Sequence, residues 1–154
     1  MKKLLAAVLI LSMLLMAVPG MGETVLAAST ADAQKLDATY TLALNAINKE
    51  DYATARKYLN IAFVYCDRQT NPIMYADLLL KQACLDVIEG NLDIALLSLD
   101  AALTVQPDLA DAYLVRTQIY TAAGNFDKAV ENLEKYIELT EIPLSNPKET
   151  ASCW

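Results

Sequence analysis

The stretches GNLDIALLSLDAAL (Gly90–Leu103) and GNFDKAVENLEKYI (Gly124–Ile137) open with the same turn and then repeat the same apolar spacing. Glycine readily takes the left-handed conformation that closes a helix, and asparagine is favoured where the next helix begins. The residues before each glycine place apolar side chains at helical spacing, without Pro or Gly. The two stretches therefore predict a helix–turn–helix unit that occurs twice.

A weaker third copy lies upstream, at LDATYTLALNAINKEDYATARKYLNIAFVYCD (residues 36–67). Glu50 stands where the other copies have glycine, and a left-handed glutamate costs about 1–2 kcal/mol, which favours a different turn here. The spacing in sequence from Asp51 to Asn91 is six residues longer than the spacing from Asn91 to Asn125. These fall around DRQTNPIM, where Pro72 marks the break between units.

The two strict copies have the helix–turn–helix period of about 34 residues that is typical of the tetratricopeptide repeat (TPR), and the chain resembles that family. The matching positions are Leu42, Ala43, Ala55 and Leu59 in the first unit, Leu79, Ala83, Ala95, Leu99 and Pro107 in the second, and Tyr113, Tyr120, Gly124, Ala129 and Leu133 in the third. The chain departs from the family's pattern at Asp86, Arg116, Thr117 and Tyr136. The resemblance implies an all-α fold, a right-handed solenoid of about three units over residues 36–69, 76–109 and 110–143.

The two ends of the chain differ from the repeats in composition. Residues 1–28 have the parts of a secretory signal: Lys2 and Lys3, an apolar run over residues 4–18, a Pro-Gly break, and small residues at Ala27 and Ala28. We expect cleavage near Ala27 or Ala28, which leaves residues 29–35 as a linker and residues 144–154 as a polar tail. The protein is then exported to an extracellular, cell-wall or periplasmic space. The alternative is an uncleaved tether to the membrane through residues 4–18.

The composition argues against several classes of function. The chain has no His, four Gly and a net charge of −7, so it lacks the commonest catalytic base and zinc ligand and cannot form a glycine-rich phosphate loop. We expect no enzymatic activity, no cofactor and no metal, and the acidic charge disfavours nucleic acid as a partner. Cys66 and Cys84 are interpreted as small buried residues, and Cys153 as the more reactive thiol.

The resemblance also implies a binding surface, because in this family the first helices of successive units line a concave groove that binds peptides. The residues expected in this groove are Tyr40, Leu44, Ile47, Leu80, Cys84, Val87, Leu114, Gln118 and Thr121. An acidic rim would consist of Asp37, Asp77 and Asp111, and would select peptides with Lys or Arg beside apolar anchors. The alternative is that each aspartate only favours the N-terminus of its helix.

These features predict an exported, non-catalytic interaction module that binds a protein or peptide segment in its concave groove. The alternative is an assembly subunit that self-associates through the ends of its array, with an inert groove. We expect the last helix of the array to be polar outside, through Glu131, Glu134, Lys135 and Glu138, and therefore to need no cap.

Overall fold

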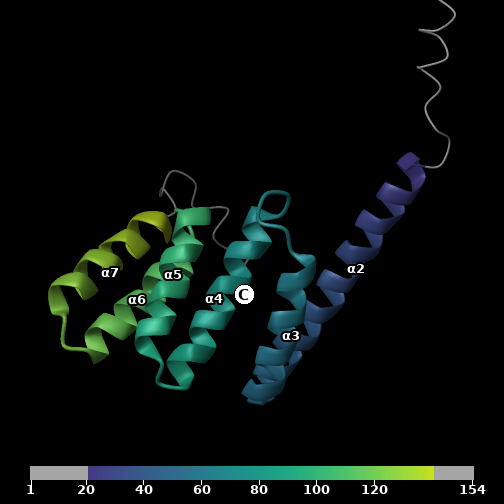
Figure 1. The fold of residues 1–154 in the computed structure, drawn as a ribbon. Coiled ribbons are helices and arrows are strands. Elements are labelled where there is room, and N and C mark those ends of the chain that lie inside the picture. Colours follow the sequence, from purple (N-terminus) through teal and green to yellow (C-terminus); the bar gives the residue numbers. More distant parts are fainter. Residues whose placement is uncertain (1–20, 141–154) are drawn as a thin grey trace, which may run out of the picture.

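The computed structural model describes residues 21–140, and their side chains from Thr30 onward. These residues form six helices and no strand (Figure 1). The helices are α2 (Met21–Asn48), α3 (Tyr52–Tyr65), α4 (Pro72–Ile88), α5 (Leu92–Val105), α6 (Ala110–Ala122) and α7 (Phe126–Thr140).

The helices pack in three pairs, α2 with α3, α4 with α5 and α6 with α7, and the pairs stand in a row (Figure 1). Successive pairs meet where α3 contacts α4 and where α5 contacts α6. α4 also contacts α6, whereas among the described residues no contact joins α5 to α7. The first helices of the second and third pairs therefore lie on the inner side of the row. The prediction of an all-α helical-repeat array is confirmed.

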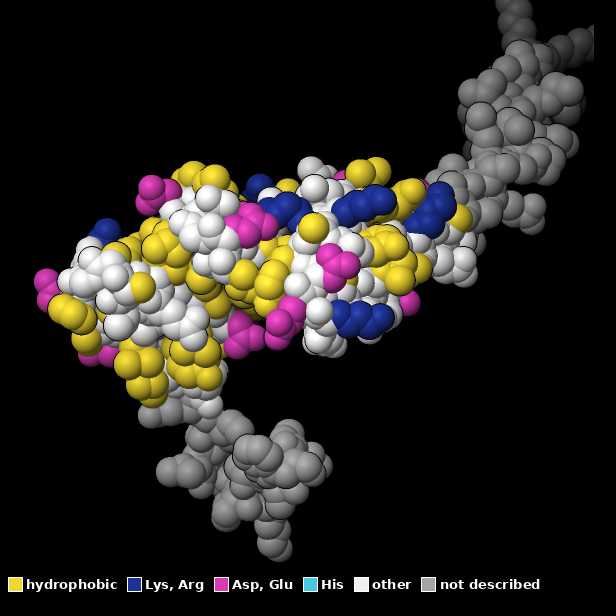
Figure 2. Space-filling view, turned by 90° about the horizontal axis from the view of Figure 1, so that it is seen from below, with side chains coloured by type: hydrophobic (Ala, Val, Ile, Leu, Met, Phe, Trp, Pro, Cys, Tyr) yellow, Lys and Arg dark blue, Asp and Glu magenta, His cyan; other side chains and the backbone are white. Residues whose placement is uncertain are grey.

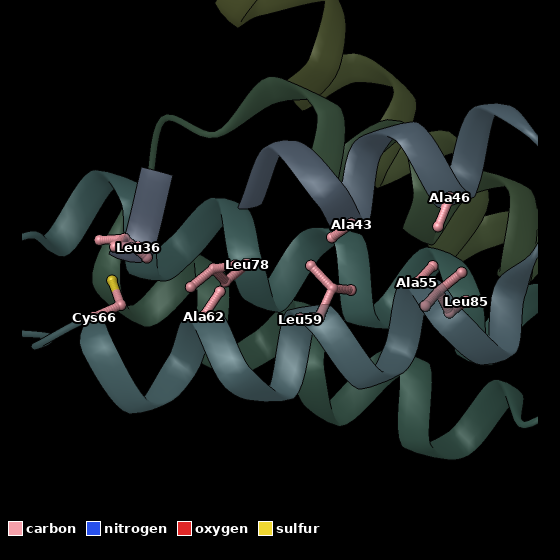
Figure 3. Close-up of a cluster of buried hydrophobic side chains, with 9 residues drawn as sticks. All are labelled: Leu36, Ala43, Ala46, Ala55, Leu59, Ala62, Cys66, Leu78 and Leu85. Carbon is pink, nitrogen blue, oxygen red and sulfur yellow. The ribbon is translucent and has the colours of Figure 1, made fainter. Parts of the chain in front are cut away.

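Small residues let the helices of each pair approach closely. Ala43 of α2 and Ala55 of α3 are both fully buried, and Ala83 and Ala95 repeat this arrangement between α4 and α5. Leu59 lies below Ala43 in the first core cluster, and α4 adds two leucines to the same cluster (Figure 3). One helix pair cannot cover its own apolar side chains, so each core is completed by the pair that follows.

The three turns have the same geometry. Glycine closes the first helix of the second and third pairs, at φ 82° for Gly90 and 71° for Gly124, and Glu50 takes the same position at φ 59°. The backbone N–H of Asp51 bonds to the Ala46 carbonyl at 2.9 Å, as that of Asn91 bonds to the Asp86 carbonyl at 2.8 Å. The prediction of a different first turn is wrong, because the closely packed helices determine where the chain must reverse, whichever residue occupies the turn.

The expectation of a linker over residues 29–35 is also wrong, because α2 begins at Met21 and runs through them without a break. This segment contains Ala, Gln and Lys but no Gly or Pro, so nothing in it stops a helix. Residues 1–20 of the predicted signal segment and the tail over residues 144–154 lie outside the described residues. Within residues 21–140, no helix combines the length and the apolar character that a membrane span requires.

Two departures from the TPR pattern are ion pairs between successive units. Asp86 of α4 is buried and pairs with Arg56 of α3 at 2.8 Å, and Glu89 joins the same guanidinium at 2.9 Å. Arg116 of α6 pairs with Asp100 of α5 at 3.2 Å. In both cases the charged residue finds its counter-ion on the neighbouring unit.

Candidate peptide-binding face

The inner face is formed by α2, α4 and α6, as the resemblance implied. Of the residues predicted to line a groove there, six are half-buried, namely Tyr40, Leu44, Ile47, Cys84, Val87 and Leu114, and two are exposed, namely Gln118 and Thr121. Leu80 does not belong to this set. It is 2% exposed and lies in the second core cluster with Leu99 of α5, so its place in the predicted groove is wrong.

The three aspartates of the predicted acidic rim have different surroundings. Asp37 is exposed in the middle of α2, far from the first turn of that helix. Asp111 is exposed in the first turn of α6, where a negative charge favours the helix N-terminus. Asp77 is half-buried, and hydrogen bonds connect it to its neighbours. The explanation from the helix dipole therefore accounts for Asp111 alone.

Asp77 connects α2 to α4 across the inner face. The Tyr40 hydroxyl of α2 donates a hydrogen bond to Oδ2 of Asp77, and Lys81 Nζ lies 3.4 Å from Oδ1. Burial and the bond to Asp77 raise the pKa of Tyr40 well above its usual value. The phenol therefore stays protonated and remains a donor to Asp77 at physiological pH.

Cys84 lies on the same face, two turns further along α4 than Asp77. Burial raises the pKa of its thiol, and the charges of Asp111 and Asp77 raise it further, while Lys81 acts in the opposite direction. Burial also raises the pKa of Cys66, which is 5% exposed. Neither cysteine is in a disulfide, and Cys66 fits the expectation of a small buried residue, whereas Cys84 is only half-buried. Cys153 lies outside the described residues.

A cavity of about 500 Å³ opens where α4 and α6 begin. Its walls come from the segment before α4, the first turns of α4, and the connection between α5 and α6. The lining residues are Thr70, Asn71, Pro72, Ile73, Met74, Asp77, Gln106 and Leu109. Asp77 thus belongs both to the cavity and to the polar cluster on the inner face. We call this cavity the α4 pocket.

The α4 pocket combines an apolar wall with hydrogen-bond acceptors. Pro72, Ile73 and Leu109 supply aliphatic surface. Oε1 of Gln106 is buried and has no hydrogen-bond partner among the described residues. The carboxylate of Asp77 can accept further bonds beside those from Tyr40 and Lys81, since an ionised carboxylate has about four acceptor sites. This arrangement suits a ligand group that is apolar along its length and a donor at its end.

Among the residues that line the α4 pocket, only Asp77 was predicted from the sequence to belong to a binding site. The available signal was the wider spacing between the first two units than between the last two, because part of the insertion forms one wall of the pocket. The insertion is stabilised at its start by Asp67, whose Oδ1 accepts bonds from the backbone N–H groups of Gln69 and Thr70 at 2.7 and 2.9 Å. These bonds hold the pKa of Asp67 below its usual value.

Within the described residues, no group of three or more His, Cys, Asp or Glu side chains is arranged to hold a metal ion. The carboxylates of the last helix lie along an exposed, polar hollow between α6 and α7 rather than in an enclosed site.

Comparison with known proteins supports the fold. Neither a protein-family model nor a curated protein matches the chain. Among solved structures, the chain is similar to the crystal structure of MamA, a TPR-containing protein, with a TM-score of 0.58 and 23% identity. The match covers 68% of this chain and 57% of that chain. The chain thus has a TPR-like fold, and it spans little more than half the length of MamA.

Proposed function

We propose that this chain is a non-catalytic protein-interaction module, which binds a peptide or a segment of another protein along its inner face. The TPR-like fold supports an interaction role by analogy. The absence of His from the sequence argues against catalysis. Export belongs to the proposal on the strength of the predicted signal segment over residues 1–28. The partners are then proteins or peptides of an extracellular, cell-wall or periplasmic space.

The α4 pocket carries the proposal, because it is the place where the inner face can hold one side chain of a ligand. Its acceptors and aliphatic wall suit the long side chain of Lys or Arg. The unit over residues 76–109, which supplies Asp77, Gln106 and Leu109 of the pocket, contains one Lys and six Asp or Glu. This excess of negative charge favours a cationic ligand and disfavours a free carboxylate.

Binding of amidated nonapeptides to the purified protein tests this proposal. The central residue is Lys, Arg, norleucine or Glu, and the flanking residues are apolar or neutral. We expect the Lys and Arg peptides to bind about tenfold or more tightly than the norleucine peptide, since a hydrogen bond to a charged group contributes about 1.5–3 kcal/mol. Glu should abolish binding.

Asp77→Asn keeps the size of the side chain and removes its charge, so it should erase most of the difference between Lys and norleucine. Asp93→Asn is the matched control, because Asp93 is an exposed acid of the same unit on α5 and does not line the pocket. Equal binding of the Lys and norleucine peptides to the unmodified protein would reject the pocket as a cation site. If both substitutions had the same effect, the preference for Lys over norleucine would come from general charge attraction and not from the pocket.

A further inference from the structure

The last helix, α7, presents an apolar face that no other helix of residues 21–140 covers. Its exposed apolar residues are Phe126 at 66%, Val130 at 54%, Leu133 at 39% and Ile137 at 42% exposure. They recur at intervals of four, three and four residues, so they lie along one side of the helix. We call this side the α7 face. The expectation of a polar outer surface was therefore incomplete, because Glu131, Glu134, Lys135 and Glu138 occupy other sides of α7.

The repeat itself indicates what kind of element the α7 face accepts. One repeat earlier in the chain, the equivalents of Leu133 and Ile137 are Leu99 and Leu103 of α5, which are 0% and 9% exposed. They are buried because α6 lies across them and contributes Ala112 and Ile119 to the same cluster. The α7 face is thus the surface to which the first helix of a further unit would bind. No helix of residues 21–140 covers it.

A second copy of this chain can supply such a helix. α2 is the first helix of the first unit, and its outer side carries Ala38 and Leu42 at the positions of Ala112 and Arg116 in α6. Leu42 is 44% exposed, and Ala38 is also exposed. No other unit precedes α2 within the described residues. The two ends of the array therefore present an unpaired acceptor face and an unpaired donor helix.

Charged residues border the apolar residues at both ends. Lys35 lies on the same side of α2 as Leu42, seven residues before it, and pairs with Asp32 at 3.3 Å, whereas Lys49 follows the end of α2. On α7 the apolar face is bordered by Asp127, Glu134 and Glu138. Glu134 is the equivalent of Asp100, which pairs with Arg116 at the internal boundary. On the side of the molecule drawn in Figure 2, most Lys and Arg side chains lie over the α2–α3 end, and hydrophobic side chains are exposed at the α6–α7 end.

We propose that α2 of a second copy packs on the α7 face, so that copies of this chain join head to tail. The contact places α2 on α7 as α6 lies on α5, with Leu42 and Asn45 of α2 at the positions of Arg116 and Ile119. Because the two surfaces differ, the contact does not close on itself after two copies, and it leaves a free face at each end for further growth. Joining of copies in this way does not depend on the proposed binding of peptides at the α4 pocket.

Complementary variants of the protein test the inference. The protein is studied by sedimentation in the form recovered from the cells that express it. Its average mass should rise with protein concentration and exceed the mass of a dimer. Leu133→Glu disables the α7 face and Leu42→Glu disables α2, so each variant alone should be a monomer. Mixed in equal amounts, they should form a dimer with twice the monomer mass and grow no further, because each retains one intact surface. Val64→Glu is the control, since Val64 is 78% exposed on α3 and belongs to neither surface; it should assemble like the unmodified protein.

Each other outcome overturns the proposal. A protein that stays monomeric at all concentrations would mean that its own residues 141–154, or nothing, cover the α7 face. Dimers of Leu42→Glu alone would mean that α7 pairs with α7. If Leu133→Glu associated as strongly as the unmodified protein, the contact would lie elsewhere, for example at the apolar residues 4–18. Circular dichroism and the melting temperature of each variant establish that it is folded. We expect folded variants because Leu42, Val64 and Leu133 are all exposed.

Discussion

The two boundaries inside the array are built differently. Between the first and second units, α4 contributes two leucines to the first core cluster, and a buried charge, Asp86, meets Arg56. Between the second and third units, α6 contributes Ala112 and Ile119, and the side chain of Asp100 in the Arg116 pair is 59% exposed. The same helix–turn–helix repeat thus uses one boundary that depends on a buried ion pair and one that depends mainly on apolar contact. The difference predicts unequal responses to equivalent substitutions.

The largest difference is expected when the arginine is removed at each boundary. Arg56→Ala leaves Asp86 charged, 4% exposed at its side chain and without its counter-ion, which costs about 3–5 kcal/mol. Arg116→Ala leaves behind a carboxylate, Asp100, that is 59% exposed and well solvated, and should cost about 0–1 kcal/mol. Urea denaturation of both variants measures the two values. Similar losses would mean that the two boundaries are equivalent in energy.

The double variant Arg56→Met/Asp86→Leu sharpens the same comparison. Replacing both members of a buried ion pair by apolar residues removes the cost of desolvation and is often neutral or stabilising by about 1–4 kcal/mol. We expect the double variant to regain most of the stability that Arg56→Ala loses, again measured in urea. A double variant as unstable as Arg56→Ala would show that apolar side chains cannot fill this boundary.

A smaller effect is expected at the turns, with opposite signs in the first and third units. Glu50→Gly should raise the free energy of unfolding by up to about 1 kcal/mol, because it relieves a left-handed glutamate but makes the unfolded chain more flexible. Gly124→Ala should lower it by about 1–2 kcal/mol, although a Cβ at this site meets no atom within 4 Å. The midpoint of thermal unfolding reports both changes. A loss of stability in Glu50→Gly would contradict the shared turn geometry.

The smallest effect concerns the Tyr40–Asp77 bond, which connects the first unit to the α4 pocket. The pKa of Tyr40 is raised in the folded protein, whereas the pKa of a tyrosine in an unfolded chain is about 10. The folded state keeps its proton above that pH while the unfolded chain loses it, so this contribution to stability falls as the pH rises past about 10. Tyr40→Phe should flatten the fall in stability between pH 9 and 11, compared with Tyr120→Phe as control. Identical pH profiles would mean that the bond is not formed in solution.

The sequence was sufficient for the architecture because the turn residues and the small residues recur at a fixed spacing. Gly90 and Gly124 mark their turns correctly, and the buried alanines lie where the helices approach. Glu50 was misjudged because packing over two whole helices outweighs the strain of one residue. Residues 29–35 were misjudged because the start of the first repeat, at residue 36, was taken for the start of its first helix.

The candidate site was harder to predict than the fold. Leu80 was assigned to the groove by analogy, but the period of the helix places it toward α5 instead. The α4 pocket escaped notice because it depends on three segments that are distant in the sequence, and because an insertion, unlike a repeat, has no second copy to compare with. The ion pairs were visible only as departures from a pattern, and their partners required the structure.

The central claim is that ligands bind at the α4 pocket, where α4 and α6 begin. An NMR titration of the ¹⁵N-labelled protein with the amidated Lys nonapeptide tests it most directly. We predict that the largest shifts of amide signals fall on residues 70–77 and 106–109, with smaller shifts along α2. Shifts confined to α5 and α7, or spread evenly over the chain, would contradict the claim.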